Sequence, residues 1–239
     1  MTLLRARNLS KSFGGVHAVR AVDFDLEPGE IRALIGPNGA GKTTFVGMLC
    51  GRVTANAGTV EFRGRDITAL PMHRRVRRGI AYTFQITSIF PNLTARENIA
   101  VAAQNRRAAR AAGLRDAVAA TLRQVGLEAL QHQRAGDLAY GHQRLLEAAM
   151  GLALAPRLLI LDEPTQGLSD GEIERFCGLI AHANRAPDGA TILLIEHNLS
   201  VVMALARRIT VLERGQVLAE GAPDEIRRNA AVQAAYLGA

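Results

Sequence analysis

The apolar residues of this chain gather in short runs, each of which is followed by a polar or glycine-rich stretch. Such runs, bounded by turn residues, predict strands that are buried on both faces of a sheet. Residues 22–26 differ because apolar and acidic side chains alternate there, which predicts an antiparallel strand with one face in solvent. Together these patterns predict strands at residues 3–10, 22–26, 31–35, 59–62, 80–84, 158–161, 190–195, 209–213 and 216–220.

The middle of the chain has a helical pattern instead. Residues 95–151 are rich in alanine, and three glycines are expected to break this segment into separate helices. These glycines are Gly113, Gly126 and Gly136. Thr94 and Glu97 have the spacing of a capping box, which marks the start of the first helix. Because strands precede and follow this segment, we expect an α/β protein with a helical insert. Shorter helices are predicted at residues 44–49, 71–78, 223–228 and 230–237.

The length and composition fit one large folded domain, or one domain with a subdomain. The chain has 239 residues, of which 48% are hydrophobic, enough for a sizeable core. No apolar run approaches the roughly 18–20 residues that a transmembrane helix needs. Arg5 and Arg7 interrupt the N-terminal segment, where a secretory signal would lie. Cys50 and Cys177 lie far apart in helical patterns, so we expect buried thiols in a reducing cytosol rather than nucleophiles or metal ligands.

The net charge of +7 comes from arginine, because the chain contains only two lysines, Lys11 and Lys42. A basic protein can bind nucleic acid or an anionic membrane surface. However, aromatic residues make up only 4% of the chain and do not interleave with the arginine clusters at 74–78 and 106–110. Base stacking is therefore poorly supported. We interpret both clusters as solvated helix faces and expect no nucleic-acid partner.

A glycine-rich loop separates the strand predicted at 31–35 from the helix predicted at 44–49. Its sequence fits G-x-x-x-x-G-K-[ST], the phosphate-binding loop. Glycines let backbone N–H groups turn toward phosphate oxygens, and the start of the helix adds partial positive charge. Lys42 would reach the β- and γ-phosphates of a nucleotide, and Thr43 would offer its hydroxyl to Mg²⁺. The candidate nucleotide-binding residues here are Gly36, Pro37, Asn38, Gly39, Ala40, Gly41, Lys42, Thr43 and Thr44.

Polar side chains follow three of the predicted buried strands. Asp162 and Glu163 end the strand at 158–161 and would lie at the carboxyl edge of the sheet, where α/β proteins bind ligands. Asp162 is placed to hold Mg²⁺ through water, and Glu163 to accept a proton from an attacking water. His197 and Gln85 each end another strand. His197 would bond the γ-phosphate or orient the water, and Gln85 would sense Mg²⁺ or the water.

Two further features favour nucleotide binding. Phe13 lies beside two glycines, where its ring could stack on an adenine. Near residue 140 a second helix start follows a polar stretch, and Gly141 leaves its backbone N–H groups accessible to an anion. The residues assigned to this second helix start are Leu138, Ala139, Tyr140, Gly141 and His142.

In this order and spacing, the motifs resemble those of the ATP-binding cassette (ABC) ATPases over nearly the whole chain. The matched motifs are Walker A at 36–43, the Q-loop at Gln85, the signature motif at 138–142, Walker B at 158–163 with the catalytic glutamate at Glu163, the D-loop at 168–170 and the switch histidine at His197. The resemblance implies ATP and Mg²⁺ as cofactors, with Thr43, Gln85 and Asp162 around the metal.

The resemblance also implies a fold: a P-loop NTPase core with a mixed or parallel sheet, an N-terminal antiparallel β subdomain and an inserted α-helical subdomain. We expect a single ABC ATPase domain over residues 1–239. Within it, 1–85 and 157–239 would form the β subdomain and the core, and 86–156 the helical subdomain with the signature motif. In this family two cassettes pack head to tail, and the signature of one closes on the ATP held by the other.

The signature motif departs from the usual Leu-Ser-Gly-Gly-Gln of the family. Ala139 lacks the serine hydroxyl that would bond the γ-phosphate, a contact worth about 0.5–1.5 kcal/mol. Gly141 is retained, and His142 offers a different donor in place of glutamine. We therefore expect ATP turnover to be preserved but not necessarily fast.

The Leu-Ala-Tyr-Gly form of the signature resembles one subgroup, the ATPases of branched-chain amino acid importers, as do residues 13–19, 89–99 and 232–238. This resemblance implies a cytoplasmic subunit, peripheral on the inner face of the membrane, paired with an identical or related cassette. It would dock on a separate transmembrane permease through residues 86–107.

Other members of the family stay open as alternatives. They are the urea or amide importers and the exporters of lipopolysaccharide or other lipids. A soluble ABC protein acting on ribosomes or DNA is less favoured, because the chain has one phosphate loop and no long coiled coil between the motifs. The sequence does not name the transported solute.

Overall fold

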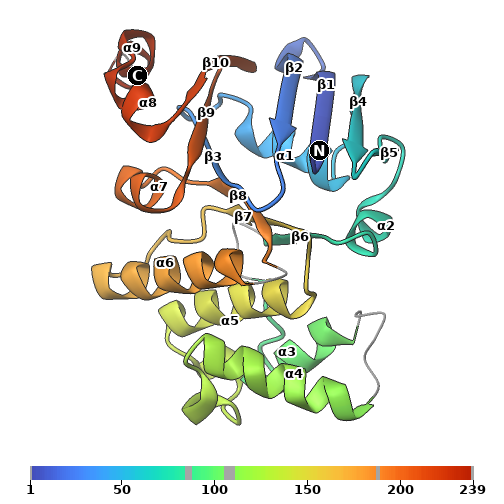
Figure 1. Cartoon of the computed structure of the whole chain (residues 1–239), viewed down its shortest axis with the longest axis vertical. Helices are drawn as coiled ribbons and strands as arrows, with labels where there is room; N and C mark the ends of the chain where they lie inside the picture. Colours follow the sequence, from blue (N-terminus) through green and yellow to red (C-terminus); the bar gives the residue numbers. More distant parts are fainter. Residues whose placement is uncertain (1, 84–87, 105–110, 187–188, 238–239) are drawn as a thin grey trace. The chain divides into compact units, whose positions relative to one another are not determined.

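The computed structural model describes residues 2–83, 88–104, 111–186 and 189–237 of the chain (Figure 1). These residues form two compact units. The first unit joins Met1–Arg78 to Thr191–Ala239, and the second is Gly79–Ala190. No helix in the described ranges is long and apolar enough to span a membrane.

The first unit contains an antiparallel sheet with the strand order β2-β1-β4-β5. Its strands are β1 (Leu4–Phe13), β2 (Val16–Leu26), β4 (Ala57–Phe62) and β5 (Arg65–Asp66). The alternation predicted for β2 is confirmed, because Val22, Phe24 and Leu26 are buried whereas Asp23 is exposed. One face of this sheet therefore packs on a core while the other meets solvent.

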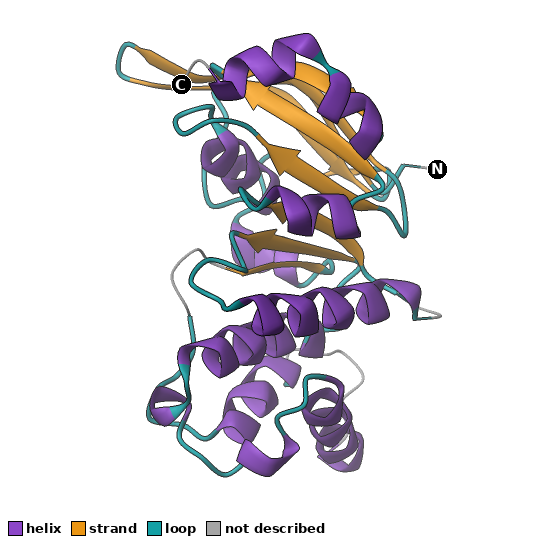
Figure 2. Ribbon diagram, turned by 90° about the vertical axis from the view of Figure 1, so that its left-hand side faces the viewer, coloured by secondary structure: helices purple, strands orange, loops and turns teal. Residues whose placement is uncertain are grey.

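The same unit contains a second set of strands and three C-terminal helices. They are β3 (Ile31–Ile35), β8 (Thr191–Ile195), β9 (Arg208–Glu213), β10 (Gln216–Gly221), α7 (Leu199–Leu205), α8 (Pro223–Arg228) and α9 (Ala230–Leu237). β3 lies between two parallel neighbours, β8 and β9, and β10 is antiparallel to β9. Figure 2 shows helices lying over the strands of this unit. Val202 of α7, Ile226 of α8 and Val232 of α9 pack on β3 and β9, so these helices close one side of a buried core.

A buried arginine holds the end of the helix that follows the phosphate loop. That helix is α1 (Lys42–Cys50), and Arg75 lies in the short helix α2 (Met72–Val76). Arg75 is only 2% exposed, and its guanidinium donates to the carbonyl oxygens of Met48 and Leu49 at the end of α1, both at 2.8 Å. The expectation that the whole arginine cluster is solvated is therefore wrong at Arg75. The last carbonyl groups of a helix have no partner within the helix and attract a cation. Here that cation is the buried guanidinium of Arg75.

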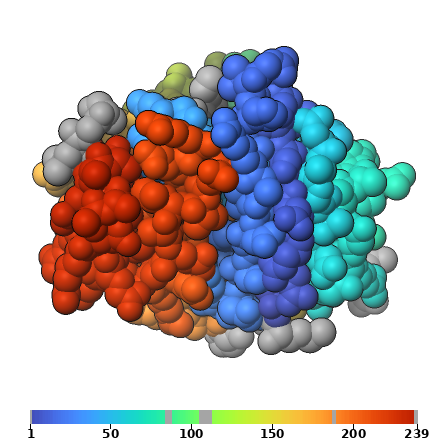
Figure 3. All heavy atoms as spheres, turned by 90° about the horizontal axis from the view of Figure 1, so that it is seen from above, coloured from blue at the N-terminus to red at the C-terminus, as the bar shows by residue number. Residues whose placement is uncertain are grey.

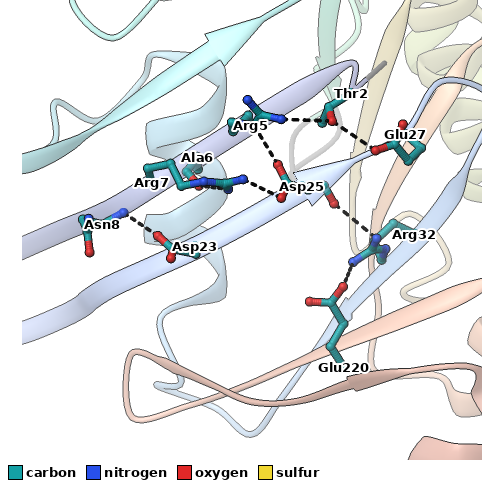
Figure 4. Close-up of polar contacts among 10 residues, drawn as sticks. All are labelled: Thr2, Arg5, Ala6, Arg7, Asn8, Asp23, Asp25, Glu27, Arg32 and Glu220. Carbon is teal, nitrogen blue, oxygen red and sulfur yellow. Dashed lines mark hydrogen bonds and ion pairs between the residues drawn. The ribbon is translucent and has the colours of Figure 1, made fainter.

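A second buried arginine, Arg32, joins three segments of the first unit. It lies in β3 and is 1% exposed, and its guanidinium donates to Glu30 Oε1 at 2.6 Å and to Glu220 Oε1 at 2.7 Å. A third bond reaches the backbone carbonyl oxygen of Asp25 at 3.2 Å; Figure 4 shows this bond and the contact with Glu220. Two carboxylates offset the charge, so the arginine is tolerated in an otherwise apolar strand. On the surface, β10 lies beside β2 (Figure 3, orange and blue).

The second unit combines two parallel strands with helices. The elements described are β6 (Ile80–Thr83), β7 (Leu158–Asp162), α3 (Ala95–Ala103), α4 (Ala111–Gln124), α5 (Tyr140–Ala153) and α6 (Asp170–Arg185). α3 begins with the predicted capping box. Thr94 Oγ1 accepts from the N–H of Glu97 at 3.2 Å, and Glu97 Oε2 accepts from the N–H of Thr94 at 2.7 Å. Two N–H groups at the helix start are thereby satisfied.

The predicted helix breaks are confirmed at two of three glycines. Gly126 follows α4 with a left-handed φ of +69°, and Gly136 lies in a short 3₁₀ turn, Ala135–Asp137, before α5. The break predicted at Gly113 is wrong, because this glycine lies inside α4. A glycine costs a helix only about 1 kcal/mol, which the packing of α4 against α3 and α5 offsets.

Both cysteines lie in helices, as their sequence patterns predict. Cys50 is buried at the end of α1, and Cys177 is half-buried in α6. The burial expected from the sequence is therefore found at Cys50 and only in part at Cys177. Burial raises the pKa of the Cys50 thiol, which makes this cysteine a poor nucleophile.

Candidate nucleotide-binding site

The loop between β3 and α1 has a backbone that only glycine can form at several points. Gly36, Gly39 and Gly41 have φ angles of +150°, +77° and +98°. A Cβ on Gly36 would lie 2.1 Å from the carbonyl oxygen of Leu212, and one on Gly41 would lie 2.2 Å from that of Ala18. Both the conformation and the lack of space therefore require glycine, and the resulting loop fits a phosphate cradle.

Lys42 reaches back into this loop from the start of α1. Its Nζ donates to the carbonyl oxygen of Gly36 at 2.6 Å and to that of Pro37 at 3.0 Å, and the side chain is buried. No side chain caps the N-terminus of α1, whose N-cap is Gly41. The ammonium group and the helix start thus present positive charge around the same loop, which suits a triphosphate. Thr43 is exposed and can turn its hydroxyl toward a metal ion.

Four residues of the second unit meet at the end of β7. Asp162 is its last residue, is 2% exposed and accepts a hydrogen bond from the Tyr82 hydroxyl at 2.5 Å. Glu163 follows with a left-handed φ of +48°, which a non-glycine residue rarely adopts. The guanidinium of Arg144, on α5, donates to the backbone carbonyl oxygen of Glu163. The two predicted acids are therefore placed by neighbours, Tyr82 and Arg144, that sequence reasoning missed.

The signature segment begins α5 and packs against the segment around the D-loop. Ala139 is the N-cap of α5 and forms no side-chain cap. The ring of Tyr140 lies against Gly167, where a Cβ would approach it to 2.9 Å. A Cβ on Gly141 would lie 1.8 Å from Glu172 Oε1. Gly141 therefore has a packing role in addition to the accessibility expected from the sequence.

Glu172 is held in place by the D-loop itself. Its Oε2 accepts from the Ser169 backbone N–H at 2.8 Å and from the Ser169 hydroxyl at 2.7 Å, which caps α6. The hydrogen bond from this hydroxyl is the largest cause of the lowered pKa of Glu172, with a smaller contribution from His142. The signature segment and the D-loop thus meet at one ionised carboxylate within the second unit.

The remaining predicted residues are less constrained. His197 follows β8 with an exposed side chain, and its backbone N–H donates to Glu196 Oε2 at 3.0 Å. Phe13 ends β1 and is 53% exposed, with the Lys11 ammonium 5.1 Å from its ring centroid. The Phe13 ring is therefore available for stacking on a base, although the Lys11 ammonium already lies over one of its faces. Gln85 lies outside the described residues.

The two compact units divide the predicted site residues between them. The phosphate loop, Phe13 and His197 belong to the first unit, whereas Asp162, Glu163 and the signature segment belong to the second. The structure brings Lys42 onto the loop carbonyls in one unit and the two acids beside Tyr82 and Arg144 in the other.

Comparison with known proteins identifies the family. Residues 19–166 match the ABC transporter family model, and residues 216–239 match that of the branched-chain amino acid ATP-binding cassette transporter. The high-affinity branched-chain amino acid transport ATP-binding protein BraF of Pseudomonas aeruginosa is 38% identical, covering 99% of this chain and 98% of the relative. LivG of Escherichia coli, which has the same description, is 39% identical with the same coverage.

Two other comparisons bear on the fold and on the alternatives. The lipopolysaccharide export system ATP-binding protein LptB of Escherichia coli is 34% identical over 100% of this chain and 98% of the relative. A solved nucleotide-free ATP-binding cassette from an ABC transporter superposes with a TM-score of 0.88 at 26% identity, covering 100% of both chains. A solved cassette in its ADP conformation gives the same values. The fold expected from the motifs is therefore confirmed, and the chain belongs to the ABC transporter family.

Proposed function

We propose that this chain is the ATP-hydrolysing subunit of an importer for branched-chain amino acids, working with a separate membrane permease. The observation that carries this proposal is the glycine cradle at 36–41, with the buried Lys42 ammonium already on its carbonyl oxygens. The relatives at 38–39% identity supply the substrate class. LptB, at 34%, keeps lipid export as the second candidate, and importers of urea or amides stay open.

The residues of the cradle would bind the nucleotide. Lys42 would exchange the carbonyl oxygens of Gly36 and Pro37 for phosphate oxygens, which are stronger acceptors because they are charged. Phe13 would stack on the adenine ring. Mg²⁺, held by Thr43, Gln85 and Asp162, would neutralise charge on the phosphates.

Glu163 would act as the general base. Its carboxylate would accept a proton from the attacking water, while His197 would orient that water or the γ-phosphate. Tyr82 would fix the orientation of Asp162, and Arg144 would fix the peptide of Glu163. The chain's own contribution is thus to position the water and hold the charges.

A second cassette, identical or related, would complete the site. Residues 138–142 would close on the nucleotide of that partner, with the start of α5 supplying backbone N–H groups. The proposed subunit is cytoplasmic and lies on the inner face of the cell membrane. The division of the chain into a β subdomain with the core, at 1–85 and 157–239, and a helical subdomain at 86–156 stays a prediction.

Nucleotide binding, turnover and transport can be tested separately. Lys42→Ala should abolish ATP binding in calorimetry with Mg²⁺, whereas Glu163→Gln should bind ATP, lose turnover and accumulate as a dimer. ATPase activity per chain should fall on dilution, because two chains form each site. When the chain is purified with its permease and reconstituted into vesicles, the complex should take up leucine in the presence of ATP. Extraction of lipid without leucine uptake would favour the exporter instead.

A further inference from the structure

The C-terminal helix α9 packs directly behind the strand that leads into the phosphate loop. Val232 of α9 is buried in the same cluster as Ile35, the last residue of β3, and Tyr236 packs against that cluster. The segment that matches the branched-chain transporter family model, 216–239, includes this helix. α9 is therefore anchored at the point where the loop begins.

Tyr236 is half-buried, and its hydroxyl oxygen is fully buried. Among the described residues, its hydroxyl has no partner at hydrogen-bonding geometry. Burial raises the pKa of Tyr236, and the backbone N–H of Gly36 partly offsets this rise. Tyr236 also packs against the cluster that contains Ile35, the residue before Gly36, so its side chain lies at the start of the loop. A buried hydroxyl without a partner destabilises a protein, so stabilisation of the fold does not explain why a tyrosine stands at position 236.

Gly36 is also the residue that holds Lys42. Its carbonyl oxygen accepts from Nζ at 2.6 Å, while the backbone of Leu212 leaves no room for a Cβ. If Lys42 turned to a phosphate, the Gly36 carbonyl would lose this charged donor, and the backbone at Gly36 would be able to tilt. A small tilt would bring the Gly36 N–H into line with the Tyr236 oxygen.

The space around the loop fits a pivot at Gly36. A cavity of about 530 Å³ lies between loop residues 37–40, the β9–β10 turn at 213–214 and three alanines of α9. The alanines are Ala231, Ala234 and Ala235. α9 therefore touches the base of the loop but leaves clearance over its tip. Residues 37–40 therefore have room to move about Gly36.

We propose that Tyr236 is a positioning residue for nucleotide binding, whose hydroxyl oxygen accepts from the Gly36 N–H when Lys42 leaves the Gly36 carbonyl oxygen for a phosphate. This inference rests on the proposed nucleotide site at the loop. It gives the C-terminal helix a role in the nucleotide cycle.

The test is Tyr236→Phe, which removes the hydroxyl and keeps the ring. We expect the dissociation constant and KM for ATP to rise about 3–10-fold, as the loss of one hydrogen bond predicts, with kcat unchanged. The melting temperature should be no lower than that of the wild type, because the removed hydroxyl has no partner. The matched control is Gln233→Ala, which loses the bond from Gln233 Nε2 to the Arg227 carbonyl oxygen at 2.9 Å and does not touch Gly36.

A spectroscopic readout separates this role from support of the fold. The chain has three tyrosines, so ζ-¹³C-tyrosine labelling gives three resonances, and Tyr236→Phe assigns one of them. That resonance should shift when Mg²⁺ and ADP are added. An unshifted resonance, or equal ATP affinity in Tyr236→Phe and wild type, would overturn the inference and leave the nucleotide site intact. Equal losses of affinity and melting temperature in both variants would also overturn it, as general loosening of α9. If the wild type binds no nucleotide, both proposals fail.

Discussion

Arg144 donates a hydrogen bond from its guanidinium to the backbone carbonyl oxygen of Glu163, and so ties the helix that begins with the signature segment to the proposed general base. The same guanidinium pairs with Glu147 Oε2 at 3.0 Å, and both side chains are buried. Arg144 therefore has two separable roles. It balances the charge of the buried Glu147 carboxylate. It also holds the backbone of Glu163, whose φ of +48° is unfavourable for a glutamate.

Arg144→Met should reduce both stability and turnover. It leaves Glu147 buried without its cation, which costs about 3–5 kcal/mol. The double variant Arg144→Met/Glu147→Met should recover most of this stability, because buried pairs are replaced by apolar residues at little cost. Turnover should stay low in the double variant, since the Glu163 peptide still lacks its donor. Urea midpoints and steady-state ATPase rates measure the two effects. Wild-type turnover in the double variant would show that Arg144 acts only through Glu147.

Gly141→Ala should act on α6 as well as on α5. The new methyl group would displace the Glu172 carboxylate, whose Oε1 lies 1.8 Å from its position, and so open the capping box with Ser169. Once Glu172→Ala has removed that carboxylate, adding Gly141→Ala should do little further harm. A cycle of melting temperatures over the two single variants and the double variant measures the coupling. Strictly additive losses would contradict the shared contact.

The sequence predicted those parts of the protein that local pattern determines. The alternation in β2, the buried β3, the capping box of α3 and the phosphate loop all follow from residues that are neighbours in the chain. The glycines of that loop are required by their own backbone angles, which motif and spacing reveal. The α/β fold followed from the same signals.

The contacts that position the site join residues distant in sequence, and local patterns do not show them. Arg75 was grouped with a basic cluster, yet its partners are carbonyl groups at the end of α1. Nothing near Gly141 indicates Glu172, and nothing in the apolar run of β6 distinguishes Tyr82 as the partner of Asp162. The signal that the sequence did offer was the pair of buried strands predicted at 80–84 and 158–161. The structure pairs them in parallel, and parallel strands place their carboxyl ends at the same edge of a sheet.

Arg75→Met should destabilise the phosphate-loop helix. Its guanidinium also donates to the carbonyl oxygens of Leu70 and Thr68, both at 2.8 Å, so the change leaves several buried acceptors unpaired. Hydrogen bonds from charged donors are worth about 1.5–3 kcal/mol each, and we expect a loss of at least about 3 kcal/mol. Arg74→Met is the matched control, because Arg74 is exposed on the same helix and should change stability by less than about 0.5 kcal/mol.

Urea unfolding followed by circular dichroism measures both arginine variants. Arg75→Lys should fall between wild type and Arg75→Met, since one ammonium group keeps the charge but cannot reach carbonyls in four directions. Equal midpoints for the Arg74 and Arg75 variants would mean that the carbonyl contacts contribute nothing to stability.

The β1–β2 pair contains an acidic group whose titration should be visible in stability. Arg7 donates to Asp25 Oδ2 at 2.6 Å and Arg5 to Oδ1 at 3.2 Å (Figure 4). Partial burial raises the pKa of Asp25, but the hydrogen bonds from Arg7 and Arg5 outweigh it, and the net pKa is lowered. A carboxyl whose pKa is lower in the folded state stabilises the protein above its unfolded pKa, about 3.9, and loses that contribution as pH falls.

Asp25→Asn should therefore lower the free energy of unfolding at pH 7 and have less effect as the pH falls below about 4. The wild type and the variant should converge in acid, because protonated Asp25 attracts the two guanidinium groups no more than asparagine does. Urea midpoints at a series of pH values from neutral to acid give the comparison. Asp116→Asn, at an exposed position of α4, is the control and should follow the wild type throughout. A gap between Asp25→Asn and wild type that is the same at every pH would show that packing, and not charge, is what Asp25 contributes.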